Sequence, residues 1–163
     1  MDPIANPGPP ADDFGQAAGA TAFVLRVGTD VQFISSVTDS IHRHGRRYLD
    51  RVFTAQEVES CGGYDAEPDQ LAPGLTARFC AKEATLKALR PLNIIPEWRD
   101  MEVVRMPGGW VQISLTRAAR QLAEENGLLD LEVSLAHDGA VAVATVVGLG
   151  RTRQPMTSES LTR

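Results

Sequence analysis

Two acidic residues, Asp30 and Glu83, have neighbours that could make them part of a cation or phosphate site. Asp30 follows Val27, Gly28 and Thr29 at the end of an apolar segment, and a carboxylate at such a strand end can point into a cleft. Gly28 permits another backbone to approach closely there. Taken alone, Asp30 is better explained as the N-cap of a following helix, because aspartate is among the preferred capping residues.

Glu83 is accompanied by two lysines in the segment 75–89, which has the composition of a helix. At about 100° per residue, Lys82 falls within the apolar stripe of this helix, where an ammonium group without a partner costs free energy. Lys87 follows Glu83 at the i+4 position, so one flank of the helix would carry a carboxylate beside an ammonium group. As an isolated pair, Glu83 and Lys87 are better explained as a weak surface salt bridge.

His137 is a third candidate, because it lies at the end of an apolar segment and next to Asp138. An imidazole in a turn can donate a hydrogen bond to a phosphate. Without further context, an exposed turn histidine with no chemical role is the simpler interpretation.

Hydrophobic periodicity and turn residues predict the elements that hold these candidates. Helices are predicted over residues 31–49, 54–61, 75–89 and 116–126. Strands are predicted over residues 22–27, 101–105, 110–115, 131–135 and 140–147. Asp30 would then lie at a strand-to-helix junction, and residues 62–74 would form a loop. This order predicts an α+β fold with helices packed on an antiparallel sheet.

Capping and turn residues mark several of these boundaries. Thr54 and Glu57 form a capping-box pattern that starts the second predicted helix, and Pro91 ends the third. The turn sequences at 106–109 and 137–139 contain glycine and are typical of hairpins.

The length of 163 residues and the apolar content of 43% suit one folded domain, which we expect over residues 21–150. Residues 1–20 are rich in Pro, Gly, Ala and Asp, and residues 151–163 are rich in Ser, Thr and Arg. Because neither segment shows a hydrophobic period, both are predicted to be disordered tails.

Charge and cysteine content argue against several classes of protein. A net charge of −5 disfavours a nucleic-acid-binding protein. Cys61 and Cys80 form no CxxC or Cys/His pattern, so neither a disulfide framework nor a zinc site is indicated. The N-terminus has no basic-then-apolar signal, and no apolar run is long enough to span a bilayer. We therefore expect a soluble, cytoplasmic protein that has no membrane partner.

One stretch of this acidic chain is strongly basic. His42-Arg43-His44-Gly45-Arg46-Arg47, followed by Arg51, lies at the end of the first predicted helix. A basic patch of this kind fits an acidic partner. It also complements the helix dipole, which is the structural alternative.

Taken together, these segments resemble the holo-acyl-carrier-protein synthase family of 4'-phosphopantetheinyl transferases. That family is recognised by a Gly-x-Asp element near the N-terminus and, further along, by a Phe/Trp-x-x-Lys-Glu-Ala/Ser-x-x-Lys element. Here these elements are Gly28-Thr29-Asp30 and Phe79-Cys80-Ala81-Lys82-Glu83-Ala84-Thr85-Leu86-Lys87. The resemblance covers about residues 23–149, including the segments 51–57, 77–79, 98–103 and 133–139.

The resemblance implies the 4'-phosphopantetheinyl transferase fold, a reaction and a metal ion. In such enzymes Mg²⁺ bridges the pyrophosphate of coenzyme A, and Asp30 and Glu83 would be its protein ligands. A serine hydroxyl of an apo carrier protein attacks the β-phosphate, and 3',5'-ADP leaves. A metal-bound water or a nearby carboxylate could accept the serine proton, and the sequence does not choose between them.

The resemblance also assigns the basic residues. Lys82 and Lys87 would neutralise phosphate charge, with Lys87 facing the phosphates and joining Asp30 and Glu83 as a catalytic residue. Arg78 and His137 would bind the rest of coenzyme A, including its 3'-phosphate.

Short members of this family assemble as homotrimers in which each active site lies between two neighbours. A trimer would bring His137 of one chain near Asp30 and Glu83 of another. The carrier protein is acidic along its recognition helix, and it would dock on the basic cluster that contains Arg43, Arg46, Arg47 and Arg51.

Two positions depart from the family pattern. The first element usually continues Gly-x-Asp-x-x-Glu-x-x-Arg, whereas Phe33 and Ser36 occupy the last two positions here. Since that arginine commonly contacts the carrier, we expect a partner other than the standard fatty-acid carrier, such as a dedicated polyketide or peptide-synthetase carrier.

Two other functions fit parts of the pattern. A non-catalytic module could bind coenzyme A or a carrier protein on the same fold, but the presence of Asp30, Glu83 and Lys87 disfavours it. A metal-dependent phosphohydrolase could use the same carboxylates, but it would have no need of the basic cluster.

Overall fold

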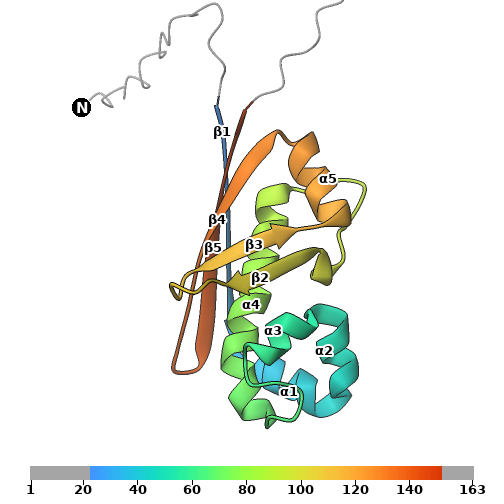
Figure 1. The fold of residues 1–163 in the computed structure, drawn as a ribbon, viewed down its shortest axis with the longest axis vertical. Helices are drawn as coiled ribbons and strands as arrows, with labels where there is room; N and C mark the ends of the chain where they lie inside the picture. The colour runs from blue at the N-terminus through green and yellow to red at the C-terminus, as the bar shows by residue number, and fades with distance from the viewer. Residues whose placement is uncertain (1–22, 152–163) are drawn as a thin grey trace, which may run out of the picture.

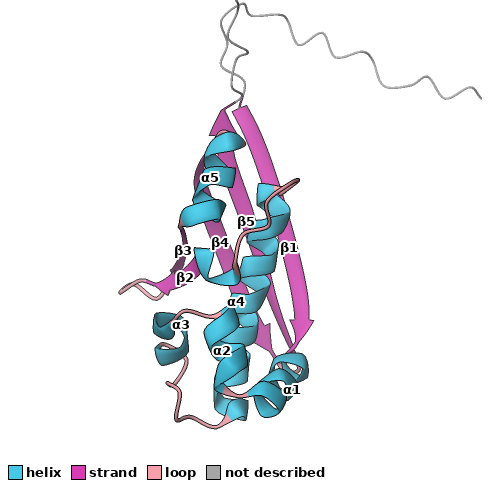
Figure 2. Ribbon diagram, turned by 90° about the vertical axis from the view of Figure 1, so that its right-hand side faces the viewer, coloured by secondary structure: helices cyan, strands magenta, loops and turns pink. Residues whose placement is uncertain are grey.

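The fold is built around one long helix that lies against a three-stranded sheet (Figure 1). The computed structural model describes residues 23–151. Strands β1 (Phe23–Phe33), β4 (Leu128–Asp138) and β5 (Val141–Arg151) form an antiparallel sheet in the order β1-β5-β4. Helix α4 (Pro68–Leu89) packs on one face of this sheet, as Figure 2 also shows. β5 is therefore the central strand.

Three short helices close one end of the molecule: α1 (Ile34–His44), α2 (Arg46–Val52) and α3 (Ala55–Glu59). Their apolar side chains pack on the N-terminal part of α4, because each helix is too short to be stable alone and must bury one face. This part of the core contains Val37, Ile41, Leu49, Val52, Phe53, Val58, Leu71, Ala72 and Leu75.

A small second sheet covers another side of α4. It follows the 3₁₀ turn Trp98–Asp100 and consists of the hairpin β2 (Met101–Arg105) and β3 (Val111–Leu115). Helix α5 (Arg117–Glu125) then leads into β4. The predicted α+β class, with helices on an antiparallel sheet, is confirmed, and so is the predicted hairpin.

The capping box at the start of α3 is also present as predicted. Thr54 Oγ1 accepts a hydrogen bond from Glu57 N at 3.2 Å, and Glu57 Oε2 accepts one from Thr54 N at 2.8 Å.

The predicted boundary between the first strand and the first helix was wrong. β1 continues to Phe33, because residues 28–33 keep pairing with β5. Asp30 therefore lies inside the strand, opposite Ala144, and the N-cap of α1 is Phe33. The helix predicted over 31–49 is two helices, which are separated at Gly45 with φ +53°.

Two further boundaries differ from the prediction. α4 begins at Pro68, so the loop predicted over 62–74 ends at Glu67; a proline at the first helical position loses no helical hydrogen bond. β4 continues to Asp138, so His137 is a strand residue opposite Ala142 rather than a turn residue. The turn itself contains Gly139, which has φ +53°.

The sheet face turned away from α4 carries an extended apolar surface, which the hydrogen-bonded pair Thr29 and Thr145 interrupts in the middle. Alternate residues of β1 and β5 point outward, and the register sets Leu25 opposite Leu149 and Val27 opposite Val147. The exposed apolar residues of this face are Phe23, Leu25, Val27, Val31, Phe33, Val141, Val143, Val147 and Leu149. Monomeric proteins rarely expose so extended an apolar surface, which indicates an interface.

The predicted tails at 1–20 and 151–163 lie outside the described residues, apart from Arg151, which ends β5. Within residues 23–151, no helix is both long and apolar enough to cross a membrane.

Candidate active site

β1 and α4 approach each other so closely at Gly28 that no side chain fits between them. A Cβ atom at this position would lie 1.9 Å from the carbonyl oxygen of Ala84 and 3.0 Å from the backbone nitrogen of Ala88. Gly28 is therefore required for packing, not for an unusual backbone angle. The contact brings the even-numbered residues of β1 against the part of α4 that contains Glu83 and Lys87.

Asp30, the next residue of β1 on this face, is held by Lys87. The Lys87 ammonium group donates to Asp30 Oδ1 at 2.9 Å and to the backbone oxygen of Thr29 at 2.7 Å. The other carboxylate oxygen, Asp30 Oδ2, is buried and has no hydrogen-bond partner. A buried carboxylate oxygen without a partner is costly, so this atom is suited to accept a cation.

Glu83 lies next to this pair on α4 and is half-buried. Burial raises the pKa of its carboxyl group, the charge of Asp30 raises it further, and Lys87 acts in the opposite direction. Asp30 and Glu83 are thus close enough to repel each other, and one lysine only partly compensates for their charge.

The donor set fits a hard divalent cation such as Mg²⁺. Carboxylate oxygens are its preferred protein ligands, and it commonly takes only one or two of them together with phosphates and water. Among residues 23–151 no three His, Cys, Asp or Glu side chains gather as a metal-binding group. The site offers two carboxylates, Asp30 and Glu83, whose charges act on each other.

Cys80 borders the same carboxylate from within the core, which sequence patterns did not indicate. It is fully buried, and its Sγ lies 3.4 Å from the backbone oxygen of Ala142. Burial, followed by the charge of Asp30, raises the pKa of the Cys80 thiol to about 12. The thiol is therefore neutral and adds no negative charge to the site.

Lys82 lies apart from this cluster, on another side of α4. Its ammonium group is fully buried and contacts Glu57 Oε2 at 2.8 Å, the backbone oxygen of Met101 at 2.7 Å and that of Trp98 at 2.9 Å. Burial lowers the pKa of Lys82, and Glu57 acts in the opposite direction. With three acceptors for its three N–H groups, Lys82 has no donor left for a phosphate in this structure.

We expect Lys82→Met to lower the free energy of unfolding by about 3–5 kcal/mol, because it leaves Glu57 buried without a counter-ion. Chemical denaturation measures this loss. The double variant Glu57→Gln/Lys82→Met should recover part of it, since the charge is then removed from both sides. A near-neutral effect of Lys82→Met would show that the pair does not stabilise the fold.

Arg78 and His137 line one cavity of about 500 Å³. Arg78 is almost fully buried and donates to Ser60 Oγ at 2.8 Å and to the backbone oxygen of Gly74 at 3.1 Å, while its Nε is buried without a partner. Arg105, at the end of β2, lines the same cavity and was not singled out in the sequence. The cavity thus gathers two arginines and a histidine, which suits an anionic ligand.

This cavity and the carboxylate pair face different directions within one chain. Arg78 and Glu83 are five residues apart on α4, which places them about 140° apart around the helix axis. Glu83 faces β1, whereas Arg78 faces the cavity beside β3 and β4.

The predicted docking arginines differ in how they are held. Arg43 lies 3.7 Å from Asp39, and Arg46 lies 3.4 Å from Asp50 and 4.4 Å from the centre of the Tyr64 ring. Arg51 lines a hollow of about 440 Å³ with Trp98 and Leu86.

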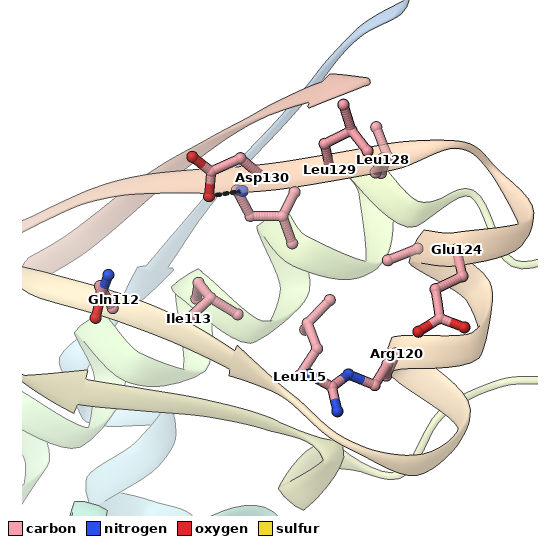
Figure 3. A pocket seen from close by; sticks show the side chains of 10 residues that line it. Gln112, Ile113, Leu115, Arg120, Glu124, Leu128, Leu129 and Asp130 are labelled. Carbon is pink, nitrogen blue, oxygen red and sulfur yellow. Dashed lines mark hydrogen bonds between the residues drawn. The ribbon is translucent and has the colours of Figure 1, made fainter. Parts of the chain in front are cut away.

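A further hollow of about 300 Å³ lies between β3, α5 and β4 (Figure 3). Leu115 and Leu128 line it together with Arg120, Glu124 and Asp130. It contains none of the predicted site residues.

Comparisons with known proteins agree on one family. Residues 26–146 match the model of the 4'-phosphopantetheinyl transferase superfamily. The chain is 40% identical over 133 residues to a holo-[acyl-carrier-protein] synthase of Gloeobacter violaceus, and the aligned region covers 82% of this chain and 98% of that protein. It is also 40% identical over 124 residues to the synthase of Moorella thermoacetica, with 76% and 93% covered. Among solved structures, the ACPS-CoA complex of Chronobacterium ammoniagenes matches with a TM-score of 0.67 and 27% identity, over 80% of this chain and 99% of that one.

Proposed function

Because this chain belongs to the 4'-phosphopantetheinyl transferase superfamily, we propose that it transfers the 4'-phosphopantetheine group of coenzyme A to a serine of an apo acyl carrier protein. The observation that carries this proposal is the Asp30 and Glu83 pair, which the Gly28 contact brings together beside Lys87. Release of 3',5'-ADP accompanies the transfer.

Asp30 and Glu83 are the proposed ligands of Mg²⁺, which when bound neutralises charge on the phosphate oxygens. The buried Asp30 Oδ2, which has no hydrogen-bond partner, supports this assignment, and so does the pKa of Glu83, which burial and then the charge of Asp30 raise. Lys87 adds a second positive charge at the same place and can donate to a phosphate oxygen. Catalysis then consists mainly of alignment and charge neutralisation.

Arg78 and His137 are proposed to bind the remaining anionic part of coenzyme A, and the cavity adds Arg105 to this set. The buried Arg78 Nε, which has no protein partner, supports an anionic ligand at this position.

A homotrimer with active sites between neighbouring chains is proposed for two reasons. The apolar face of β1 and β5 is exposed in a single chain, and the same face of further copies of this chain could pack against it. The cavity with Arg78 and His137 also faces away from Glu83 in the same chain, so one coenzyme A molecule would contact both sets most simply where two chains meet.

We expect Val147→Lys to dissociate the trimer, because Val147 lies on the central strand of the uncovered face. Glu132, opposite on β4, can pair with the new lysine, so the monomer should remain folded. Analytical ultracentrifugation should give three chain masses for the natural sequence and one for the variant. Leu92→Lys, at an exposed apolar residue outside the sheet, is the control. A trimeric Val147→Lys protein would contradict this interface.

The proposed reaction is tested by measuring 3',5'-ADP formed from coenzyme A and Mg²⁺, with and without a panel of apo carrier proteins. We expect product only in the presence of a carrier. Product without any carrier would indicate a phosphohydrolase, and coenzyme A binding without product for every carrier would indicate a non-catalytic module.

A further inference from the structure

We propose, on the basis of the transferase function above, that this chain selects a carrier whose acidic residues lie about two helical turns or more beyond its acceptor serine. Arg47 is the principal cation that binds them.

The exposed side of α1 changes in charge along its length. Its first half exposes Ser35 and Ser36, which are uncharged, and Asp39, which is negative. The exposed basic residues begin only in the last turn and continue through α2; they are His42, Arg43, His44, Arg46, Arg47 and Arg51. The opposite side of α1 is occupied, because Val37 and Ile41 are buried in the core.

Distance from the carboxylate pair follows from the chain path. α1 starts at Ile34, four residues after Asp30, at the end of β1 (Figure 2). At about 1.5 Å per residue, Arg43 lies roughly 13 Å further along the axis than Ile34. The start of α1 is therefore the part of this helix nearest to Asp30 along the chain, and we infer that the neighbours of a carrier serine placed at Asp30 and Glu83 lie beside Ser35, Ser36 and Asp39. On this part of α1 acidic carrier residues would meet no basic side chain, and the first arginine beyond it, Arg43, is paired with Asp39.

The cations further along are not equivalent. Arg43 is paired with Asp39 at 3.7 Å, and Arg46 is held by both Asp50 and the Tyr64 ring. Within residues 23–151, no carboxylate lies within 4.0 Å of the Arg47 guanidinium group, which is exposed. Arg47 can therefore bind a carrier carboxylate without losing an existing ion pair, and this makes its contribution larger than that of Arg46.

Two charge variants of one apo acyl carrier protein test the selection. The near variant keeps acidic residues only within one helical turn of the serine, and the far variant keeps them only beyond two turns; the other acidic residues become Asn or Gln. We expect kcat/KM to be about tenfold higher for the far variant. The difference should come from a lower KM at an unchanged kcat, because exposed charges act mainly on encounter and binding.

Substitutions in this chain test the assignment to Arg47. With the far variant, Arg47→Glu should raise KM about tenfold without changing kcat, and Arg46→Glu should raise it less. Arg120→Glu has the same charge change on α5, at the other end of the molecule, and should leave KM unchanged (Figure 1). An equal or higher kcat/KM for the near variant, or equal effects at Arg46 and Arg47, would overturn the proposal while transfer itself remained. If the natural chain transferred the group to neither carrier variant, the proposed function itself would be contradicted.

Discussion

Glu83→Gln is expected to lower kcat for phosphopantetheinyl transfer at least about a hundredfold, which corresponds to a loss of about 3 kcal/mol of transition-state stabilisation. The amide keeps the shape of the side chain but removes one of the two negative charges that we propose hold Mg²⁺. Because Glu83 and Asp30 repel each other in the protein, removing one charge should not destabilise the fold. Steady-state kinetics over a range of Mg²⁺ concentrations, with thermal unfolding in parallel, measures both effects.

Glu124→Gln is the matched control, because Glu124 is an exposed glutamate on α5 and lines only the hollow between β3 and β4. It should leave kcat and the Mg²⁺ dependence unchanged. Full activity of the Glu83→Gln enzyme at ordinary Mg²⁺ concentrations would show that the metal ion is held elsewhere.

The second large effect is expected at Gly28, which has no charge and touches no substrate. Gly28→Ala places a Cβ 1.9 Å from a backbone oxygen of α4, and a backbone atom of a packed helix cannot rotate away. We expect a loss of about 3 kcal/mol in unfolding free energy and a fall of roughly 10 °C in Tm. Since α4 must move away from β1, Asp30 should also separate from Glu83 and Lys87, so that kcat falls in the molecules that remain folded.

Gly148→Ala provides a comparison at another buried strand glycine. There the new Cβ would meet the end of the Leu131 side chain at 2.9 Å, and that side chain can change its rotamer. Calorimetry and activity of the two alanine variants should therefore differ clearly, with the larger loss at Gly28. Similar, small losses at both positions would show that the β1 to α4 contact is not required for the site.

The sequence suggested candidate site residues, but it did not predict the geometry that holds them. Asp30 and Glu83 were identified from two short sequence elements, yet the strand was ended too early. Alternation along β1 sets apolar residues outward and places Gly28 and Asp30 inward, against α4, so its second half lacks the continuous apolar run of a buried strand. Pairing with β5, which is far away in sequence, extends the strand to Phe33.

Lys82 shows a second limit of sequence patterns. Its position in an apolar stripe correctly indicated a buried charge that needs a partner. Nothing in the local sequence identifies Glu57 as that partner, because the capping box at the start of α3 already explains this glutamate. The same carboxylate performs both roles, since one oxygen accepts from Thr54 and Lys82 and the other from Val103.

Arg105 could not be found from sequence for a related reason. It is an ordinary charged residue at the end of β2, and only the packing of the hairpin beside α4 and β4 places it in one cavity with Arg78 and His137. Long-range packing of this kind leaves no periodic signal in the chain.

The most direct test of the proposed transfer is site-localised mass spectrometry of an apo acyl carrier protein after incubation with this chain, coenzyme A and Mg²⁺. We predict one phosphopantetheine group on the acceptor serine, with one 3',5'-ADP released for each modified carrier. The Asp30→Asn/Glu83→Gln double variant should neither modify the carrier serine nor release 3',5'-ADP. An unmodified serine with the natural sequence across a panel of fatty-acid, polyketide and peptide-synthetase carriers would contradict the transferase assignment.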